Sequence, residues 1–202
     1  MRRLAPFALV LALFFAALGR DAFDDWVAAT DLPSLLPETS VEVRDRSDIL
    51  LRAYTVEDGR WRLNVTQDQV DPRFIEMLIA YEDKRFFKHR GIDGWAVLRA
   101  GKQALTQRKV VSGASTLTMQ VARLLEQSGT GAWQGKLRQM RVALRLEKVL
   151  SKDDILRLYL TLAPYGGNIE GLRAASLSYF GKEPKRLTAA QAALLVALPQ
   201  AP

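Results

Sequence analysis

The sequence predicts a mainly α-helical protein with a small β element near its start and one transmembrane helix at its N-terminus. An uncharged apolar run covers residues 4–19 and predicts the membrane helix. Stretches that alternate with period two lie between residues 41 and 65 and predict short strands. From Asp71 onward, apolar residues recur at helical spacing, so the rest of the chain is predicted to be helical.

The composition fits one folded domain and excludes several kinds of site. Of the 202 residues, 49% are hydrophobic and 25% are charged, which is enough apolar material for a core. The chain has no cysteine, which rules out disulfides, thiolate zinc sites and cysteine nucleophiles. Its single histidine argues against a histidine-rich metal site, and no metal site is predicted.

Charge is distributed unevenly along the chain. Residues 21–83 carry fifteen acidic and six basic side chains, a net charge of −9. Residues 84–160 carry sixteen basic and five acidic side chains, a net charge of +11. The second stretch predicts a positive face and an anionic partner, which on charge alone is a nucleic acid, a lipid head group or a phosphorylated substrate.

Residues 1–23 are predicted to form a cytoplasmic tip and a membrane anchor. The sixteen apolar residues, at about 1.5 Å each, span roughly 24 Å of a hydrocarbon core that is roughly 30 Å thick. Arg3 and Arg20 can reach the interfaces on either side. A signal peptide cleaved near Ala17 and Gly19 is the alternative, and a buried core helix is a third. The positive charge before the run favours a cytoplasmic start and an exported remainder.

Residues 24–64 are predicted to form a linker and a short β element. Prolines mark the linker, and alternation over 41–46, 49–54 and 61–65 predicts short strands. The dipeptide Asp58-Gly59 predicts a hairpin turn.

The helices that follow are predicted mainly from capping residues and apolar periodicity. Their predicted starts are Asp71 with Pro72, Asp93, Ser115, Ser151 with Asp154, and Thr188 with Gln191. A further helix is predicted over residues 135–150, and the last helix is predicted to end at Pro199.

Residues 82–91, EDKRFFKHRG, are predicted to form a basic, aromatic turn at the end of a helix. Adjacent carboxylates on a helix point about 100° apart, so Glu82 and Asp83 are not expected to form a facing acid and base pair. One can face a cleft while the other holds the turn. A solvated charged turn is the alternative interpretation.

Two further stretches have the composition of an anion site. Residues 113–120, GASTLTMQ, place small hydroxyl residues at a helix start, where free N–H groups suit phosphate or sugar hydroxyls, although an ordinary N-cap looks the same. Arg123 lies one turn beyond them and extends the predicted site. Residues 136–147 repeat basic side chains beside an apolar stripe, which is also typical of a solvated helix face. Their basic residues are Lys136, Arg138, Arg141 and Arg145.

In this order and spacing the stretches resemble the peptidoglycan glycosyltransferase domain of family 51, found in class A penicillin-binding proteins. The family's first motif, Glu-Asp-x-x-Phe-x-x-His-x-Gly, matches residues 82–91. Its second motif, Gly-x-Ser-Thr-x-Thr-x-Gln, matches residues 113–120, and later pieces match as far as residue 202. The resemblance covers about residues 65–202 and implies a lysozyme-like glycosyltransferase domain there.

The sequence departs from the family pattern in its third motif. Where the family reads Arg-Lys-x-x-Glu, residues 135–139 read GKLRQ, so Gln139 replaces the second family glutamate. Met119, Thr161 and Arg173 replace a usual Gln, Asn and Glu. This combination resembles the 1C subgroup, in which a transpeptidase domain lies downstream.

The resemblance implies that the protein polymerises lipid II into glycan strands for the cell wall. The GlcNAc 4-hydroxyl of the acceptor would attack C1 of a MurNAc linked to undecaprenyl diphosphate, with inversion, and Glu82 would be the general base. The implied substrate-binding residues are Asp83, Phe86, His89, Gly91, Gly113, Ser115, Thr116, Thr118, Gln120, Arg123, Lys136, Gln139 and Glu147. Lys136 and Arg123 would hold the diphosphate.

One carboxylate is chemically sufficient for such a transferase. A glycosidase uses a second, protonated carboxyl group to help an alkoxide leave, whereas a diphosphate leaves without a proton when cations neutralise it. Glu147, two helical turns beyond Gln139, is a candidate substitute for the missing glutamate; an ion pair with Lys152 is the alternative. No cofactor is predicted, and a divalent cation near the diphosphate is left open.

The predicted partners are lipid II, the growing glycan strand, the membrane and the machinery of cell-wall synthesis. Residues 92–111 mix apolar and basic side chains, as a segment at a membrane interface does, although an ordinary packing helix has the same composition. The implied location is a single pass through the cytoplasmic membrane, with the catalytic domain on the periplasmic or extracellular side.

Two functions of other classes compete with this one. A non-catalytic, membrane-anchored module that binds lipid II or serves as a scaffold would keep the anion site; the intact Glu82 argues against it and Gln139 argues for it. A nucleic-acid-binding helical domain would explain the basic stretch but neither the export signal nor the hydroxyl-rich helix start, so no nucleic-acid partner is predicted.

Overall fold

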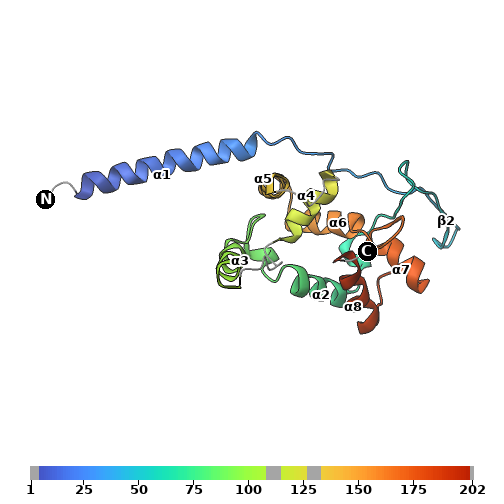
Figure 1. The fold of residues 1–202 in the computed structure, drawn as a ribbon. Coiled ribbons are helices and arrows are strands. Elements are labelled where there is room, and N and C mark those ends of the chain that lie inside the picture. Colours follow the sequence, from blue (N-terminus) through green and yellow to red (C-terminus); the bar gives the residue numbers. More distant parts are fainter. Residues whose placement is uncertain (1–4, 108–114, 127–132, 201–202) are drawn as a thin grey trace.

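The computed structural model describes residues 5–107, 115–126 and 133–200 (Figure 1). The α-helices are α1 (Ala5–Ala28), α2 (Pro72–Glu82), α3 (Gly94–Gln107), α4 (Leu117–Glu126), α5 (Trp133–Val149), α6 (Lys152–Leu162), α7 (Leu172–Phe180) and α8 (Ala189–Ala197). The strands are β1 (Glu42–Arg44), β2 (Leu50–Ala53), β3 (Trp61–Arg62) and β4 (Ile169–Glu170). The chain is therefore mainly helical, as predicted.

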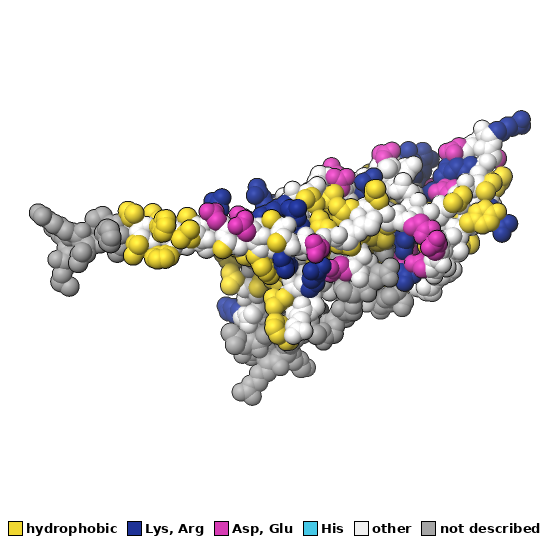
Figure 2. Space-filling model, turned by 90° about the horizontal axis from the view of Figure 1, so that it is seen from above, with side chains coloured by type: hydrophobic (Ala, Val, Ile, Leu, Met, Phe, Trp, Pro, Cys, Tyr) yellow, Lys and Arg dark blue, Asp and Glu magenta, His cyan; other side chains and the backbone are white. Residues whose placement is uncertain are grey.

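Helix α1 projects away from the body of the molecule (Figures 1 and 2). Its outer part exposes hydrophobic side chains such as Phe14 and Phe15, whereas its inner end carries charged ones, including Asp24. Among the described residues, no helix is long and apolar enough to cross a membrane. The transmembrane helix predicted over residues 1–23 is therefore not found among the described residues, which include only part of that range.

The core forms where α4 packs against α5 and α6, and α2 packs against α8. Phe74 and Leu78 of α2, Leu146 of α5 and Leu195 of α8 are fully buried within it. The helical spacing of these apolar residues therefore explains which face of each helix points inward.

Most of the predicted helix starts are confirmed by their hydrogen bonds. Asp71 accepts a hydrogen bond from the backbone N–H of Arg73 at 3.0 Å, and Asp93 caps α3 in the same way. The capping boxes of α6 and α8 are also formed. The predicted cap Ser115 is wrong, because the Thr116 hydroxyl accepts from the N–H of Met119 instead (3.1 Å).

The strands form two small pairs whose arrangement the sequence did not predict. β1 and β2 pair antiparallel, whereas β3 pairs in parallel with β4. The turn at Asp58-Gly59 exists, with φ of +79° at Gly59, but it does not join two paired strands. The predicted hairpin is therefore wrong, because the partner of β3 comes from a distant part of the chain.

Two smaller differences concern the C-terminal part. α7 follows β4 without a predicted start; its N-cap is Gly171, which provides no side-chain hydrogen bond. The last helix ends at Ala197, and the 3-10 turn Leu198–Gln200 continues from it. This turn carries Pro199 and Gln200 toward the C-terminal end of α2, as the contacts of Gln200 below show.

Candidate active site

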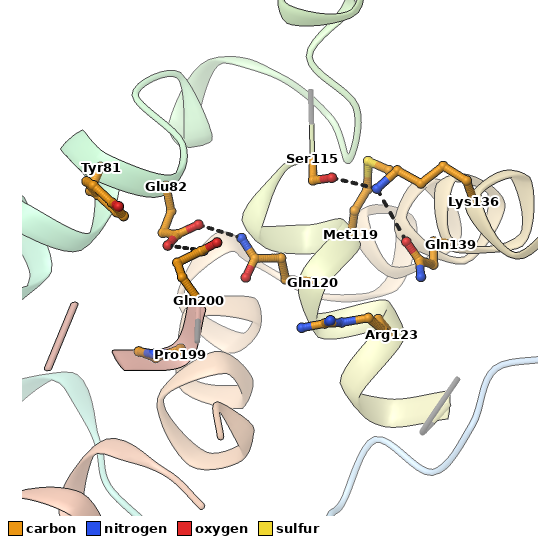
Figure 3. Close-up of a pocket in the computed structure, with 10 residues that line it drawn as sticks. All are labelled: Tyr81, Glu82, Ser115, Met119, Gln120, Arg123, Lys136, Gln139, Pro199 and Gln200. Carbon is orange, nitrogen blue, oxygen red and sulfur yellow. Dashed lines mark hydrogen bonds between the residues drawn. The ribbon is translucent and has the colours of Figure 1, made fainter. Parts of the chain in front are cut away.

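The candidate site is a cavity of about 380 Å³ between the C-terminal end of α2, the start of α4, the start of α5 and the turn after α8. Figure 3 shows the residues that line it. They are Tyr81, Glu82, Ser115, Met119, Gln120, Arg123, Lys136, Gln139, Pro199 and Gln200. The first, second and third predicted motifs therefore meet around one cavity.

Glu82 is the last residue of α2, and its carboxylate faces the cavity. The Nε2 of Gln120 donates to Oε2 of Glu82 at 2.8 Å, and the Nε2 of Gln200 donates to Oε1 at 2.5 Å (Figure 3). Two neutral amides thus hold the carboxylate from α4 and from the turn after α8. A half-buried carboxylate at a cavity wall has the exposure that a general base requires.

The neighbouring Asp83 is buried and holds the turn. Its carboxylate lies 2.9 Å from Nε2 of His89 and accepts a hydrogen bond from the N–H of Leu117 at 3.0 Å. These bonds connect the turn after α2 to the start of α4. The two adjacent carboxylates therefore have separate roles, one at the cavity and one within the protein.

Three further residues of the motifs support the cavity from outside its wall. Phe86 is fully buried, and the ammonium of Lys152 lies 4.3 Å from the centre of its ring. Gly91 has φ of +81°, and a Cβ there would lie 2.8 Å from the carbonyl oxygen of Ala143 on α5. The Thr116 hydroxyl donates to the carbonyl of Gly91 at 2.5 Å. Only glycine therefore fits where the first motif crosses α5.

The second motif provides residues that line the cavity and residues that are buried behind its wall. Ser115 and Gln120 line the cavity, whereas Thr118 is fully buried and donates to Glu147 at 2.7 Å. Gly113 lies outside the described residues. Because Thr116 caps α4, the hydroxyl of Ser115 remains available to Lys136, whose Nζ donates to it at 2.5 Å.

Lys136 and Arg123 form the positive side of the cavity. Among the described residues, Lys136 contacts only neutral oxygens there, those of Ser115 at 2.5 Å and Gln139 at 3.4 Å. Neither cation has an ion pair with any residue that the structure describes. Burial lowers the pKa of the Lys136 ammonium, and the positive charge of Arg123 lowers it further. Two adjacent cations that form no ion pair within the described part of the chain are suited to bind an anion.

Gln139 and Glu147 lie in different places. Gln139 is buried at the cavity wall, next to Lys136. Glu147 does not line the cavity; its carboxylate accepts from Lys152 at 2.6 Å and from Thr118 at 2.7 Å. The prediction that Glu147 replaces the missing glutamate is therefore wrong, because the alternative ion pair with Lys152 holds it. No group of acidic, histidine or cysteine side chains that could hold a metal occurs in the described part of the chain.

Three other basic residues of α5 contact α4 or the N-terminal segment. Arg138 pairs with Glu126 at 2.8 Å, and Arg141 donates to the carbonyl of Trp26 at 2.6 Å and lies over its ring. Lys148 pairs with Asp24 at 2.6 Å. Arg141 and Lys148 therefore hold α1, and none of the three side chains lines the cavity.

Some cavity residues were not predicted as site residues. Gln200 belongs to the closing Leu-Pro-Gln-Ala-Pro piece of the resemblance, which was the one signal for it. Tyr81, Met119 and Pro199 complete the wall.

Tyr159 of α6 is 1% exposed, and its hydroxyl has no hydrogen-bond partner among the described residues. Burial raises its pKa, and the negative charge of Glu82 raises it further.

A family model described as Transglycosylase matches residues 49–202. The chain belongs to this family. It is 46% identical to penicillin-binding protein 1C of Escherichia coli (strain K12) over 198 residues, which are 98% of this chain and 24% of that protein. It is 33% identical to penicillin-binding protein 1F of Bacillus subtilis (strain 168) over 196 residues, 96% of this chain and 27% of that protein.

Penicillin-binding protein 1A of Escherichia coli (strain K12) is a further relative, 39% identical over 141 residues, which are 70% of this chain and 17% of that protein. The chain therefore spans between 17% and 27% of the length of these relatives. The family match and the identity to a protein named 1C confirm the resemblance to a glycosyltransferase domain of the 1C subgroup. The prediction that the domain is an enzyme of the transferase class is confirmed at the level of the family.

Proposed function

We propose that the protein is a peptidoglycan glycosyltransferase that polymerises lipid II into glycan strands. The observation that carries the proposal is the arrangement of one cavity: the carboxylate of Glu82 faces it, and so do Lys136 and Arg123, two cations with no ion pair among the described residues. This arrangement supplies one base and one anion site. Those are the groups that displacement of a diphosphate by a sugar hydroxyl requires.

In the proposed reaction, Glu82 accepts the proton of the acceptor's GlcNAc 4-hydroxyl as its oxygen attacks C1 of the donor MurNAc. The new C1–O bond forms as the bond from C1 to the diphosphate oxygen breaks, with inversion at C1. The electron pair of the broken bond remains on undecaprenyl diphosphate, whose charge Lys136 and Arg123 stabilise. The proton on Glu82 then passes to solvent.

The polar neighbours orient these groups. Gln120 and Gln200 hold the carboxylate of Glu82, and Ser115 and Gln139 hold the ammonium of Lys136. Gln139 is neutral, so it leaves the full positive charge of Lys136 for the diphosphate. Its replacement of a glutamate is therefore compatible with activity.

The proposal includes attachment at the outer face of the cytoplasmic membrane. The side chains of Trp95 and Leu98 on α3 are 68% and 67% exposed, and Phe87 is exposed near the end of the first motif. The outer part of α1 adds exposed apolar side chains. Such surfaces suit an acyl boundary, where a lipid-linked substrate resides. A single-pass anchor and a neighbouring transpeptidase domain remain parts of this proposal.

The test is polymer synthesis by the purified, detergent-solubilised chain from lipid II, resolved on a gel that separates glycan strands. We expect polymer from the wild type and none from Glu82→Gln, which keeps the shape of the side chain and removes its basicity. Glu76→Gln is the matched control, since Glu76 is exposed on the same helix outside the cavity. It should polymerise like the wild type.

The alternative function, a module that binds lipid II without turnover, makes a different prediction. It requires that the wild type bind lipid II and form no polymer, and that Gln139→Glu restore synthesis. Polymer from both the wild type and Glu82→Gln would show that Glu82 is not the base.

A further inference from the structure

A second cavity, of about 690 Å³, lies beside the first, and Arg123 lines both. Its walls come from the linker, the turn after β2, the C-terminal end of α4 and the segment that leads to β4. In Figure 3 the linker, drawn in light blue, runs past the part of α4 that carries Arg123. The reaction proposed above uses no other residue of this cavity.

One wall of the second cavity is apolar. Leu124, Leu125 and Leu162 form it from the body of the protein, and Leu36 and Pro37 face it from the linker. Leu36 is 84% exposed, so its side chain is not part of the core. This wall can accept small alkyl groups.

The other wall carries both signs of charge. Arg62 and Glu170 are buried and paired at 2.6 Å, and Arg60 binds the same carboxylate group. By contrast, the carboxylates of Glu38 and Glu57 have no hydrogen bond or ion pair within the described residues. The fixed arginine cluster therefore shapes the wall, while two free carboxylates remain at its rim.

The chemistry of the donor connects the two cavities. In lipid II one MurNAc ring carries the diphosphate at C1 and a short peptide on its lactyl group at C3. If the diphosphate lies on Lys136 and Arg123, the peptide branches off within one sugar ring of Arg123. The branch contains alanine methyl groups, carboxylates and a free amine, and a wall with apolar, cationic and anionic groups matches each of these.

We propose that the second cavity binds the peptide branch of the saccharide substrate. The amine of the branch lies toward Glu38 and Glu57, and its methyl groups lie on Leu124 and Leu125. This inference rests on the proposed function, because it takes lipid II as the substrate. It makes the linker, which belongs to none of the three motifs, a part of substrate selection.

The experiment compares two substrates in two proteins, all in the same detergent. The substrates are lipid II with its full peptide and lipid II trimmed to the lactyl group. The proteins are the wild type and the double variant Glu38→Gln/Glu57→Gln, with Glu76→Gln as the matched control on an exposed carboxylate elsewhere. Initial rates of polymerisation give KM and kcat for each combination.

We expect the double variant to raise KM for the full substrate by about fivefold, the size of two exposed ion pairs, with kcat unchanged. For the trimmed substrate the variant and the wild type should be equal. Equal KM values for the full substrate in both proteins would overturn the inference, and so would an equal rise for both substrates, which would indicate that the cavity binds the sugar chain. If the wild type polymerises neither substrate, it is the proposed function that fails.

Discussion

Both faces of α5 carry basic side chains, but the partners of these side chains differ between the two faces. On the outer face, Arg138, Arg141 and Lys148 pair with acidic side chains or backbone carbonyls of the N-terminal segment and α4. On the cavity face, the described partners of Lys136 are neutral oxygens. Basic composition is therefore a poor guide to a binding site, whereas an unmatched cation at a cavity wall is a good one.

The largest expected effect separates these two faces directly. Lys136→Ala should lower the rate of polymerisation by about 10²–10³-fold, as the loss of a group that stabilises transition-state charge does. Lys148→Ala, on the outer face, should leave the rate within about twofold, because its exposed ion pair lies outside the cavity. Initial rates with lipid II check both. Equal losses in the two variants would contradict the distinction.

The second-largest effect is expected from a substitution where the first motif contacts α5. Gly91→Ala should destabilise the protein by about 2–3 kcal/mol, because an L residue is strained at that backbone conformation and its Cβ would meet the backbone of Ala143. Thermal unfolding measures this. Gly101→Ala in α3 is the control: no atom lies within 4 Å of its Cβ position, so this change should not lower the midpoint. An unchanged midpoint for Gly91→Ala would show that the turn can adjust.

A smaller effect is expected from a substitution on the outer face of α5, where α1 docks. Arg141→Ala should weaken the docking of α1 by about 1 kcal/mol, because it removes the bonds to the carbonyl of Trp26 and the contact with its ring. Amide hydrogen exchange at the C-terminal end of α1 should become faster, with polymerisation in detergent unchanged. Unchanged exchange would mean that other contacts hold α1.

A further effect, seen only in acid, concerns Asp71 at the start of α2. Hydrogen bonds from Arg73 lower the pKa of Asp71 from 3.8 to about 2, so the ionised form stabilises the fold. This stability is present above pH 4 and is lost as the pH falls toward about 2. Unfolding midpoints between these pH values should fall less steeply in Asp71→Asn than in the wild type. Parallel slopes would contradict the assignment.

The sequence predicted those features whose cause is local. The capping bonds of Asp71 and of the two capping boxes depend on residues within three positions of each other. The separate roles of Glu82 and Asp83 follow from the angle between neighbours on a helix, and the structure shows one at the cavity and one in the turn. The meeting of the motifs at one cavity followed from the family resemblance.

The features that were missed depend on distant contacts. β3 pairs with β4, and Gln200 reaches Glu82, across more than a hundred residues. α4 is capped by Thr116 and not by Ser115, whose hydroxyl accepts a hydrogen bond from Lys136 of another helix. Glu147 is held by Lys152 and Thr118. The strand partner and the side-chain partners are selected by tertiary packing, which a local sequence pattern does not show.

The claim that Lys136 holds the diphosphate is tested most directly by measuring the binding of lipid II without turnover. Equilibrium binding of labelled lipid II in detergent should be compared between Glu82→Gln, which cannot turn the substrate over, and Glu82→Gln with Lys136→Ala. The account predicts that adding Lys136→Ala weakens binding by about tenfold or more, while adding Lys148→Ala has no effect. Equal binding by all three proteins would contradict the claim that Lys136 holds the diphosphate.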